Sequence, residues 1–173
     1  MLKTRLAVIS AVHFALAPGV VVGLVPWAMT GWDLQTRPWS SPALRTLGAA
    51  MIAAGVAMLV RLFVRFVAEG LGTPAPVAPT RHLVVSGLYC YVRNPMYIGV
   101  VAAIVGQALL LGRAGLFVYA AAVWCTVAAF ARWYEEPALH ERFAGSYDEY
   151  RVAVPAWWPR MHPWAPSPRF DDA

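Results

Sequence analysis

The chain alternates four long apolar blocks with polar segments rich in turn-forming residues. The blocks run over Leu6–Met29, Leu44–Val67, Met96–Leu111 and Leu116–Ala131. The first carries no formally charged residue over about the length that a bilayer-spanning helix requires. Only Gly112–Gly115 separates the last two blocks, and so short a link predicts an antiparallel helical hairpin. The pattern therefore predicts an all-α integral membrane protein with about four transmembrane helices.

The first two blocks contain residues that bear on helix packing. Pro18 and Pro26 interrupt the first block, and such breaks are tolerated in membranes where neighbouring groups satisfy the freed carbonyls. His13 lies in the same block, as either a functional group or a packed neutral histidine. Small residues in the second block favour close contact with another helix: Gly48, Ala49, Ala53, Ala54, Gly55 and Ala57.

The pattern changes after Ala131 to an amphipathic one. Apolar positions at spacings of four, four and three form one stripe opposite a charged face: Leu139, Phe143, Tyr147 and Tyr150. Gly145 is expected to break this helix. Ser146, with Glu149 three residues later, has the spacing of a capping box and predicts a second helical start.

Composition and charge indicate a membrane environment. Of the 173 residues, 60% are hydrophobic and 13% are charged, which is far from a soluble average. The formal net charge of +5 lies on an apolar background, whereas a nucleic-acid-binding protein presents a basic face on a polar one. We expect no nucleic-acid partner. The two cysteines, Cys90 and Cys125, have no metal-ligand spacing, and no metal is expected.

The distribution of the 14 lysines and arginines predicts the topology. With four spans, only Arg37, Arg45 and Arg113 lie on the side opposite to both termini. The other eleven are Lys3, Arg5, Arg61, Arg65, Arg81, Arg93, Arg132, Arg142, Arg151, Arg160 and Arg169. Because positive residues favour the cytoplasmic side, both termini are predicted to be cytoplasmic. We expect a single membrane domain over 1–173: two spans in 1–69, a connector in 70–95, a hairpin in 96–131 and an amphipathic tail in 132–173.

The polar segment Arg81–Gly99 lies between two apolar blocks and holds the most suggestive chemistry. Pro95 preorganises the first turn of a helix, so a helix is predicted to begin there. Its free N–H groups beside Arg93 suit a carboxylate or phosphate. Tyr97 adds a hydroxyl and an aromatic face, and Gly99 allows something to approach the backbone closely.

A pair of carboxylates, Glu135 and Glu136, follows the fourth block on the same predicted side of the membrane. Together with the polar segment they can form one site, for a ligand that carries an anionic group and a diol or amine. A simpler alternative is that the pair only solvates a helix end, with Arg132 pairing to Glu136 at i,i+4.

Two long motifs carry a resemblance to a known superfamily. They are GLYCYVRNPMYIG and EEPALHERFAGSYDEYRVAVP, and with the hairpin between them they resemble the integral membrane isoprenylcysteine carboxyl methyltransferases and phospholipid N-methyltransferases. Those proteins carry GxYxxxRHPxYxG followed by EExxLxxxFGxxYxxYxxxVP. The resemblance covers Arg81–Pro159, with Asn94 in place of the usual histidine and an extra Ala144 before Gly145.

The resemblance implies an S-adenosylmethionine-dependent methyltransferase that acts at the cytoplasmic membrane face on a lipophilic or small acceptor, in a bacterial inner membrane. The implied catalytic residues are Arg93, Asn94, Tyr97 and Glu136. The implied cofactor-binding residues are His82, Leu83, Val84, Val85, Gly87, Tyr89, Arg93, Asn94, Pro95, Tyr97, Glu135 and Glu136. The acceptor is expected to meet Tyr147, Tyr150, Arg151 and Trp157.

Two other functions remain open on the sequence. The membrane sterol and steroid reductases are similar in their C-terminal half and use a nicotinamide cofactor, although they are generally longer. A non-catalytic membrane scaffold is the third possibility. An amide at Asn94 cannot replace a histidine that moves protons, whereas it can replace a histidine that only hydrogen-bonds the cofactor.

Overall fold

The computed structural model describes residues 16–37, 41–68, 83 and 85–165, and their regular structure is helical throughout. In chain order the elements are η1 (Gly19–Leu24), α2 (Val25–Thr30), α3 (Pro42–Ala68), η2 (Gly87–Cys90), α4 (Pro95–Leu111), α5 (Ala114–Phe130), η3 (Ala131–Glu135) and α6 (Glu136–Ala153). The chain divides into two compact units, one of Met1–Pro79 and Met96–Trp124 and the other of Thr80–Pro95 and Cys125–Ala173.

Two stretches of the described chain are long and apolar enough to cross a membrane, Pro42–Arg65 and the helical run Ala114–Ala153. Leu16–Thr30 and Pro95–Leu111 are apolar but shorter helices. The all-helical class is thus confirmed for the described residues, and the count of four spans stays a prediction. The residues before Leu16, including His13, lie outside the described part.

The predicted hairpin is present in the first unit. Gly112 adopts a left-handed conformation (φ 68°), which glycine accommodates without steric cost, and it ends α4 while α5 begins at Ala114. The link is therefore two residues long, shorter than the predicted four. Two clusters of buried side chains join the two helices, Ile104 with Ala120 and Ala108 with Leu116.

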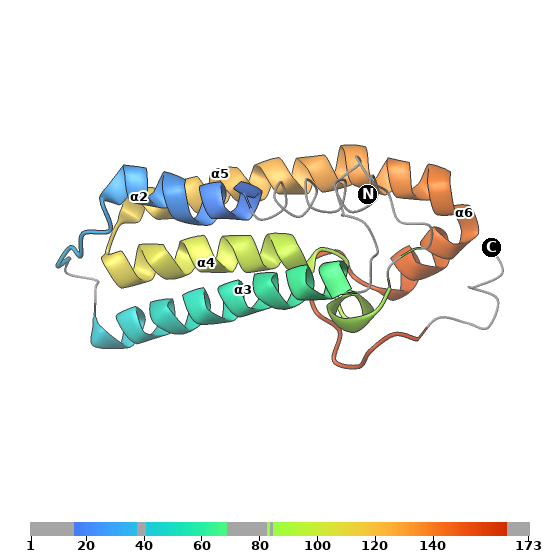
Figure 1. Cartoon of the computed structure of the whole chain (residues 1–173), viewed down its shortest axis with the longest axis horizontal. Coiled ribbons are helices and arrows are strands. Elements are labelled where there is room, and N and C mark those ends of the chain that lie inside the picture. Colours follow the sequence, from blue (N-terminus) through green and yellow to red (C-terminus); the bar gives the residue numbers. More distant parts are fainter. Residues whose placement is uncertain (1–15, 38–40, 69–82, 84, 166–173) are drawn as a thin grey trace. The chain divides into compact units, whose positions relative to one another are not determined.

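Helices α3 and α4 run side by side (Figure 1) and touch through glycines. A Cβ on Gly55 would lie 2.6 Å from the carbonyl oxygen of Gly99, and a Cβ on Gly48 would lie 2.6 Å from that of Gly106. These pairings are antiparallel. The expected close approach at Gly99 is confirmed, and the approaching group is the backbone of α3. The alanines predicted to share this contact are exposed.

A proline break in the first helix is compensated by side chains from its neighbours. Residues Gly19–Leu24 form a π-helix, in which the N–H of Val25 donates to the carbonyl of Val20. Pro26 has no N–H, so the carbonyls four and five residues before it lose a helical donor. The side-chain amide of Gln107 donates to Val22 O at 2.8 Å, and the Tyr119 hydroxyl donates to Val21 O at 2.9 Å. This arrangement is the compensation that the sequence predicted for Pro26.

Replacing Gln107 by leucine is expected to destabilise the first unit by about 1–2 kcal/mol, because a buried carbonyl loses its donor. Unfolding of the purified protein in mixed detergent would measure the loss. In a Pro26→Ala background, which restores the missing N–H, the same substitution should cost less. An equal cost in both backgrounds would contradict the compensation.

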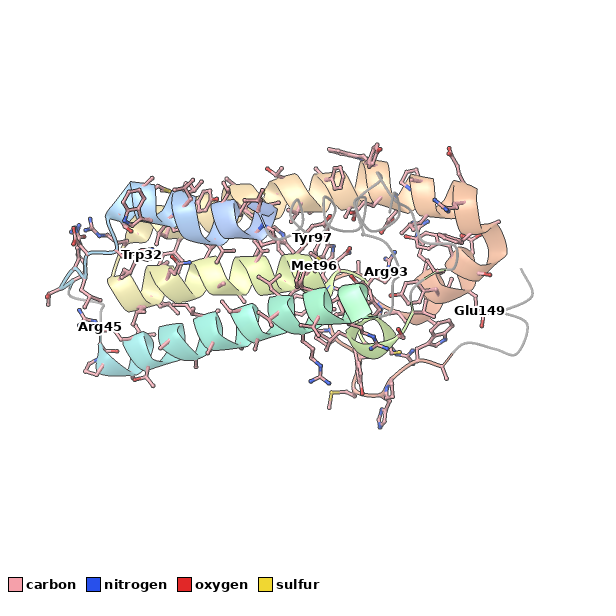
Figure 2. The ribbon with its side chains drawn as sticks, in the orientation of Figure 1. Trp32, Arg45, Arg93, Met96, Tyr97 and Glu149 are labelled. Atoms are coloured by element: carbon pink, nitrogen blue, oxygen red, sulfur yellow. The ribbon has the colours of Figure 1, made fainter. Side chains whose placement is uncertain are left out.

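The loop between α2 and α3 is fastened to the turn of the hairpin. Arg113 donates to the carbonyls of Thr30 and Asp33 at 3.3 Å each, and the Gln35 N–H donates to Leu111 O at 2.8 Å. Trp32 and Arg45 lie at this same end of the unit (Figure 2). Of the three arginines predicted to lie on this side, Arg113 and Arg45 both hold the loop, since Arg45 Nη2 donates to Gln35 O at 3.2 Å.

The second unit is organised by a sharp reversal within α6. Ala144 has non-helical angles (φ 35°, ψ −113°) between two helical arms, and the second arm turns back beside the first (Figure 1). The sequence predicted a break at Gly145, so that position is corrected by one residue. A non-glycine residue at positive φ is strained by about 1–3 kcal/mol. The motif's extra residue, Ala144, is thus the one that bends the helix.

The predicted apolar stripe forms the core of this unit. Tyr147, Tyr150 and Val154 are buried, and Leu139 and Phe143 pack against them. The other partners are Leu83, Val85, Ala153 and Trp164. The amphipathic pattern of α6 is therefore satisfied by the polar segment before α4 and by the C-terminal tail.

Candidate functional site

The two sequence motifs meet in one ion pair inside the second unit. Arg93 Nη1 donates to Glu136 Oε1 at 2.9 Å, and the same nitrogen donates to the Tyr147 hydroxyl at 3.2 Å. The side chains of Arg93 and Glu136 are only 13% and 12% exposed. The structure thus brings Arg93 and Glu136 together, and their role in a ligand site stays a prediction.

Two further arginines approach the same carboxylate. Arg132 Nη1 lies 3.5 Å and Arg151 Nη2 lies 3.7 Å from Glu136 Oε2, so the predicted i,i+4 pair is present as well. Among the described residues, three guanidinium groups therefore surround one carboxylate. Arg93 Nε is also buried without a hydrogen-bond partner in this part of the chain. The cluster is suited to one more negatively charged group.

Backbone hydrogen bonds to the tail hold Arg93 in place. The N–H of Arg93 donates to Pro155 O at 2.9 Å, and Asn94 donates to Ala156 O at 3.2 Å from both its backbone N–H and its side-chain amide. Arg160 N–H donates to Tyr91 O at 2.9 Å. Asn94 therefore fastens the tail to the segment before α4, which is a contact that the sequence did not indicate.

Three tyrosines are linked to the ion pair: the buried Tyr147 contacts Arg93, the buried Tyr150 lies beside Tyr147, and the half-buried Tyr89 is hydrogen-bonded to Tyr150. The Tyr150 hydroxyl donates to the carbonyl of Tyr89 at 2.8 Å. Burial raises the pKa of Tyr150 and of Tyr89, and the charge of Glu135 raises the pKa of Tyr89 further. Burial and then Glu136 raise the pKa of Tyr147, with Arg93 acting in the opposite direction. These hydroxyls thus remain protonated donors well above neutral pH.

We expect the second unit to lose stability above about pH 10. An unfolded tyrosine releases its proton near that pH, whereas the folded chain keeps the protons on Tyr89, Tyr147 and Tyr150, so the free energy of unfolding falls as pH rises. Each group contributes a slope of up to about 1.4 kcal/mol per pH unit. Denaturant titrations of the wild type and of Tyr150→Phe from pH 7 to pH 11 would measure it, and the variant should show the shallower slope. A slope unchanged by the substitution would contradict the assignment.

A second polar pair bridges the two arms of α6. His140 Nδ1 lies 3.0 Å from Asp148 Oδ1, and both side chains are about half exposed. Residues eight apart in a straight helix lie about 12 Å apart along its axis, so the reversal at Ala144 creates this pair. Neither residue stands out in the sequence. Only the position of the helix break near Ala144 could have indicated that they meet.

Other predicted site residues take varied positions. Gly87 has a left-handed φ of 65° at the start of η2, which gives it a conformational role. Pro95 is the first residue of α4, as predicted. Tyr97 lies in the same first turn of α4 and belongs to the first unit, so it is described apart from the cluster. Trp157 is half-buried in the tail. His82 and Val84 lie outside the described residues.

The predicted acceptor contacts Tyr147 and Tyr150 are only 2% and 4% exposed. Arg151 is more open and joins the cluster through Glu136. Their contact with an acceptor stays a prediction.

Within the described ranges, no three potential ligands among His, Cys, Asp and Glu come together to hold a metal.

These features define a helical membrane protein that carries an arginine-rich polar site. Residues 43–146 match the model of the phospholipid methyltransferase family, and the chain belongs to that family. Membership implies methyltransferase activity in general. No curated protein and no solved structure matches the chain.

Proposed function

We propose that the protein is an S-adenosylmethionine-dependent methyltransferase whose cofactor is held by the cluster around Arg93. The observation that carries the proposal is the Arg93–Glu136 pair at 2.9 Å, which joins the two motifs in one polar site. Three guanidinium groups around one carboxylate leave positive charge for the cofactor's methionine carboxylate. The buried, unpartnered Arg93 Nε fits the same group.

Different residues of the cluster would bind different groups of the cofactor. Arg93 would bind the methionine carboxylate by a charge-assisted hydrogen bond, while Glu136 orients Arg93. Glu135 would accept from the amine or the ribose hydroxyls, and the ring face of Tyr89 would favour a cation. When bound, S-adenosylmethionine supplies an electrophilic methyl group. The protein would accelerate transfer by aligning the acceptor and excluding water.

The acceptor is proposed to be lipophilic and to enter from the bilayer. The described apolar helices carry large exposed side chains, such as Val56, Val60 and Val64 of α3, as expected of surfaces in contact with lipid. Four spans with both termini in the cytoplasm would place the site at the cytoplasmic face of a bacterial inner membrane, where an acceptor of the isoprenylcysteine-carboxylate or phospholipid-amine kind is accessible.

Two measurements on detergent-purified protein test the proposal. Calorimetric titration should show binding of S-adenosylmethionine and none of reduced nicotinamide cofactors, which would separate a methyltransferase from a reductase and from a scaffold. Incubation with radiolabelled S-adenosylmethionine and a total lipid extract should then transfer label to a lipid fraction. Absence of binding would overturn the proposal, and label confined to water-soluble acceptors would overturn lateral entry.

A further inference from the structure

The pair formed by His140 and Asp148 has the geometry of a proton-accepting dyad. A carboxylate oxygen can only accept a hydrogen bond, so the imidazole Nδ1 carries the proton in the 3.0 Å contact with Asp148. That tautomer leaves Nε2 as an acceptor on the other side of the ring. The same arrangement orients the histidine base in enzymes that use a histidine and a carboxylate together.

The dyad lies one helical turn from the proposed cofactor cluster. Glu136 and His140 are four residues apart on the first arm of α6, so their side chains lie on the same face in successive turns. On the second arm, Asp148 lies between Tyr147 and Arg151, which contact the Arg93–Glu136 pair. The first arm thus carries Glu136 and His140, and the second arm carries Tyr147, Asp148 and Arg151.

The energetics argue against a purely structural role for the pair. The His140 and Asp148 side chains are 56% and 54% exposed, and even a fully charged pair this exposed adds little to stability. The reversal at Ala144 is held instead by the buried Tyr147 and Tyr150. A strained residue that brings two chemically active groups together, with little gain in stability, is characteristic of a functional site.

We infer that His140 is the general base that removes a proton from the methyl acceptor, with Asp148 holding the imidazole in the reactive tautomer. The inference rests on the proposed methyltransferase function. The acceptor is a lipid amine, because a carboxylate or thiolate is already nucleophilic and needs no base, whereas an ammonium nitrogen has no free electron pair.

The step balances in atoms and charge. The acceptor nitrogen gives one proton to His140 Nε2, and its freed electron pair forms the new N–C bond. The C–S bond breaks with its electrons remaining on the sulfur, which becomes a neutral thioether. His140, being half exposed, then releases its proton to water. The structure thus provides a base on α6 although Asn94 stands where the family carries a histidine.

The test compares His140→Gln and Asp148→Asn with two matched controls, His162→Gln and Asp33→Asn, which remove an exposed histidine and an exposed carboxylate elsewhere. The probes are S-adenosylmethionine alone for binding, and S-adenosylmethionine with phosphatidylethanolamine in detergent micelles for turnover. We expect His140→Gln to lower turnover on the order of 10²- to 10⁴-fold. Both dyad variants should bind S-adenosylmethionine like the wild type, and the controls should turn over normally.

A pH profile and a spectroscopic readout separate catalysis from folding. The titratable and charged residues next to the dyad on α6 are Glu136, Glu141, Arg142, Glu149 and Arg151, and Arg93 and Arg132 pair with Glu136. Between pH 5 and pH 8, the rise in turnover that a histidine base imposes should vanish in His140→Gln and persist in His162→Gln. In ¹⁵N-histidine NMR spectra of the wild type, His140 should be the Nδ1–H tautomer, and Asp148→Asn should abolish that preference.

Three results would overturn the inference. One is wild-type turnover in a folded His140→Gln protein that binds S-adenosylmethionine. Another is a wild type that binds S-adenosylmethionine but methylates no amine-bearing lipid. The third is a wild type that does not bind S-adenosylmethionine at all, which would overturn the proposed function together with the dyad's role. The binding measurement therefore distinguishes failure of the dyad from failure of the methyltransferase assignment.

Discussion

Gly55→Leu is expected to disrupt the packing of α3 on α4 and to lower the free energy of unfolding by at least about 3 kcal/mol. A Cβ at this position would lie 2.6 Å from the carbonyl oxygen of Gly99 and 3.1 Å from the amide nitrogen of Ala103. Overpacking usually costs about 1–3 kcal/mol when neighbouring side chains can adjust. Here the obstructing atoms are backbone, so the two helices must move apart.

Gly23→Ala is the matched control for this substitution. A Cβ at Gly23 would have no heavy atom within 4 Å, so the variant should be neutral or slightly more stable, because alanine favours a helical backbone. Detergent unfolding of both variants would measure the contrast. Equal stability of Gly55→Leu and wild type would show that the α3–α4 contact is absent in the protein.

The helices themselves could be predicted from the sequence because their signals are local. Apolar blocks and the start at Pro95 gave α3, α4 and α5 with ends displaced by no more than two residues. The stripe on α6 was also predicted, since a period near 3.6 depends only on spacing. The spacing of residues does not indicate in which direction a helix continues after a break. The sequence therefore predicted an interruption of the helix near Ala144, but not that the second arm turns back.

Contacts within the site join residues that are far apart in the chain, so local sequence patterns do not predict them. The proximity of Arg93 and Glu136 was predicted because both motifs fell on one side of the membrane. The bonds from Arg93 and Asn94 to the tail all end on backbone carbonyls, and all but one start from backbone N–H groups, so no side-chain pattern signals them. The His140–Asp148 pair exists only because α6 folds back, which is why neither residue stood out in the sequence.

Arg93→Ala is expected to weaken S-adenosylmethionine binding on the order of ten- to a hundredfold. Loss of a charge-assisted hydrogen bond to the methionine carboxylate removes about 1.5–3 kcal/mol. The substitution also leaves Glu136 in a largely buried position, and removing one partner of a buried pair costs about 3–5 kcal/mol of stability. Because Arg132 and Arg151 still face Glu136, we expect the loss of stability to be below that range.

A double substitution separates the two effects of Arg93. Replacing both partners of a buried ion pair by apolar residues of similar size is often neutral for stability, so Arg93→Met with Glu136→Met should regain much of the stability lost by Arg93→Ala. It should not regain S-adenosylmethionine binding, because the cation that holds the carboxylate is absent. Arg142→Ala, which removes an arginine that lies over Phe143, is the control for net charge and should bind normally. Calorimetry and detergent unfolding on the four proteins would measure both quantities. Wild-type affinity in a folded double variant would exclude Arg93 from the cofactor site, whatever the effect on stability.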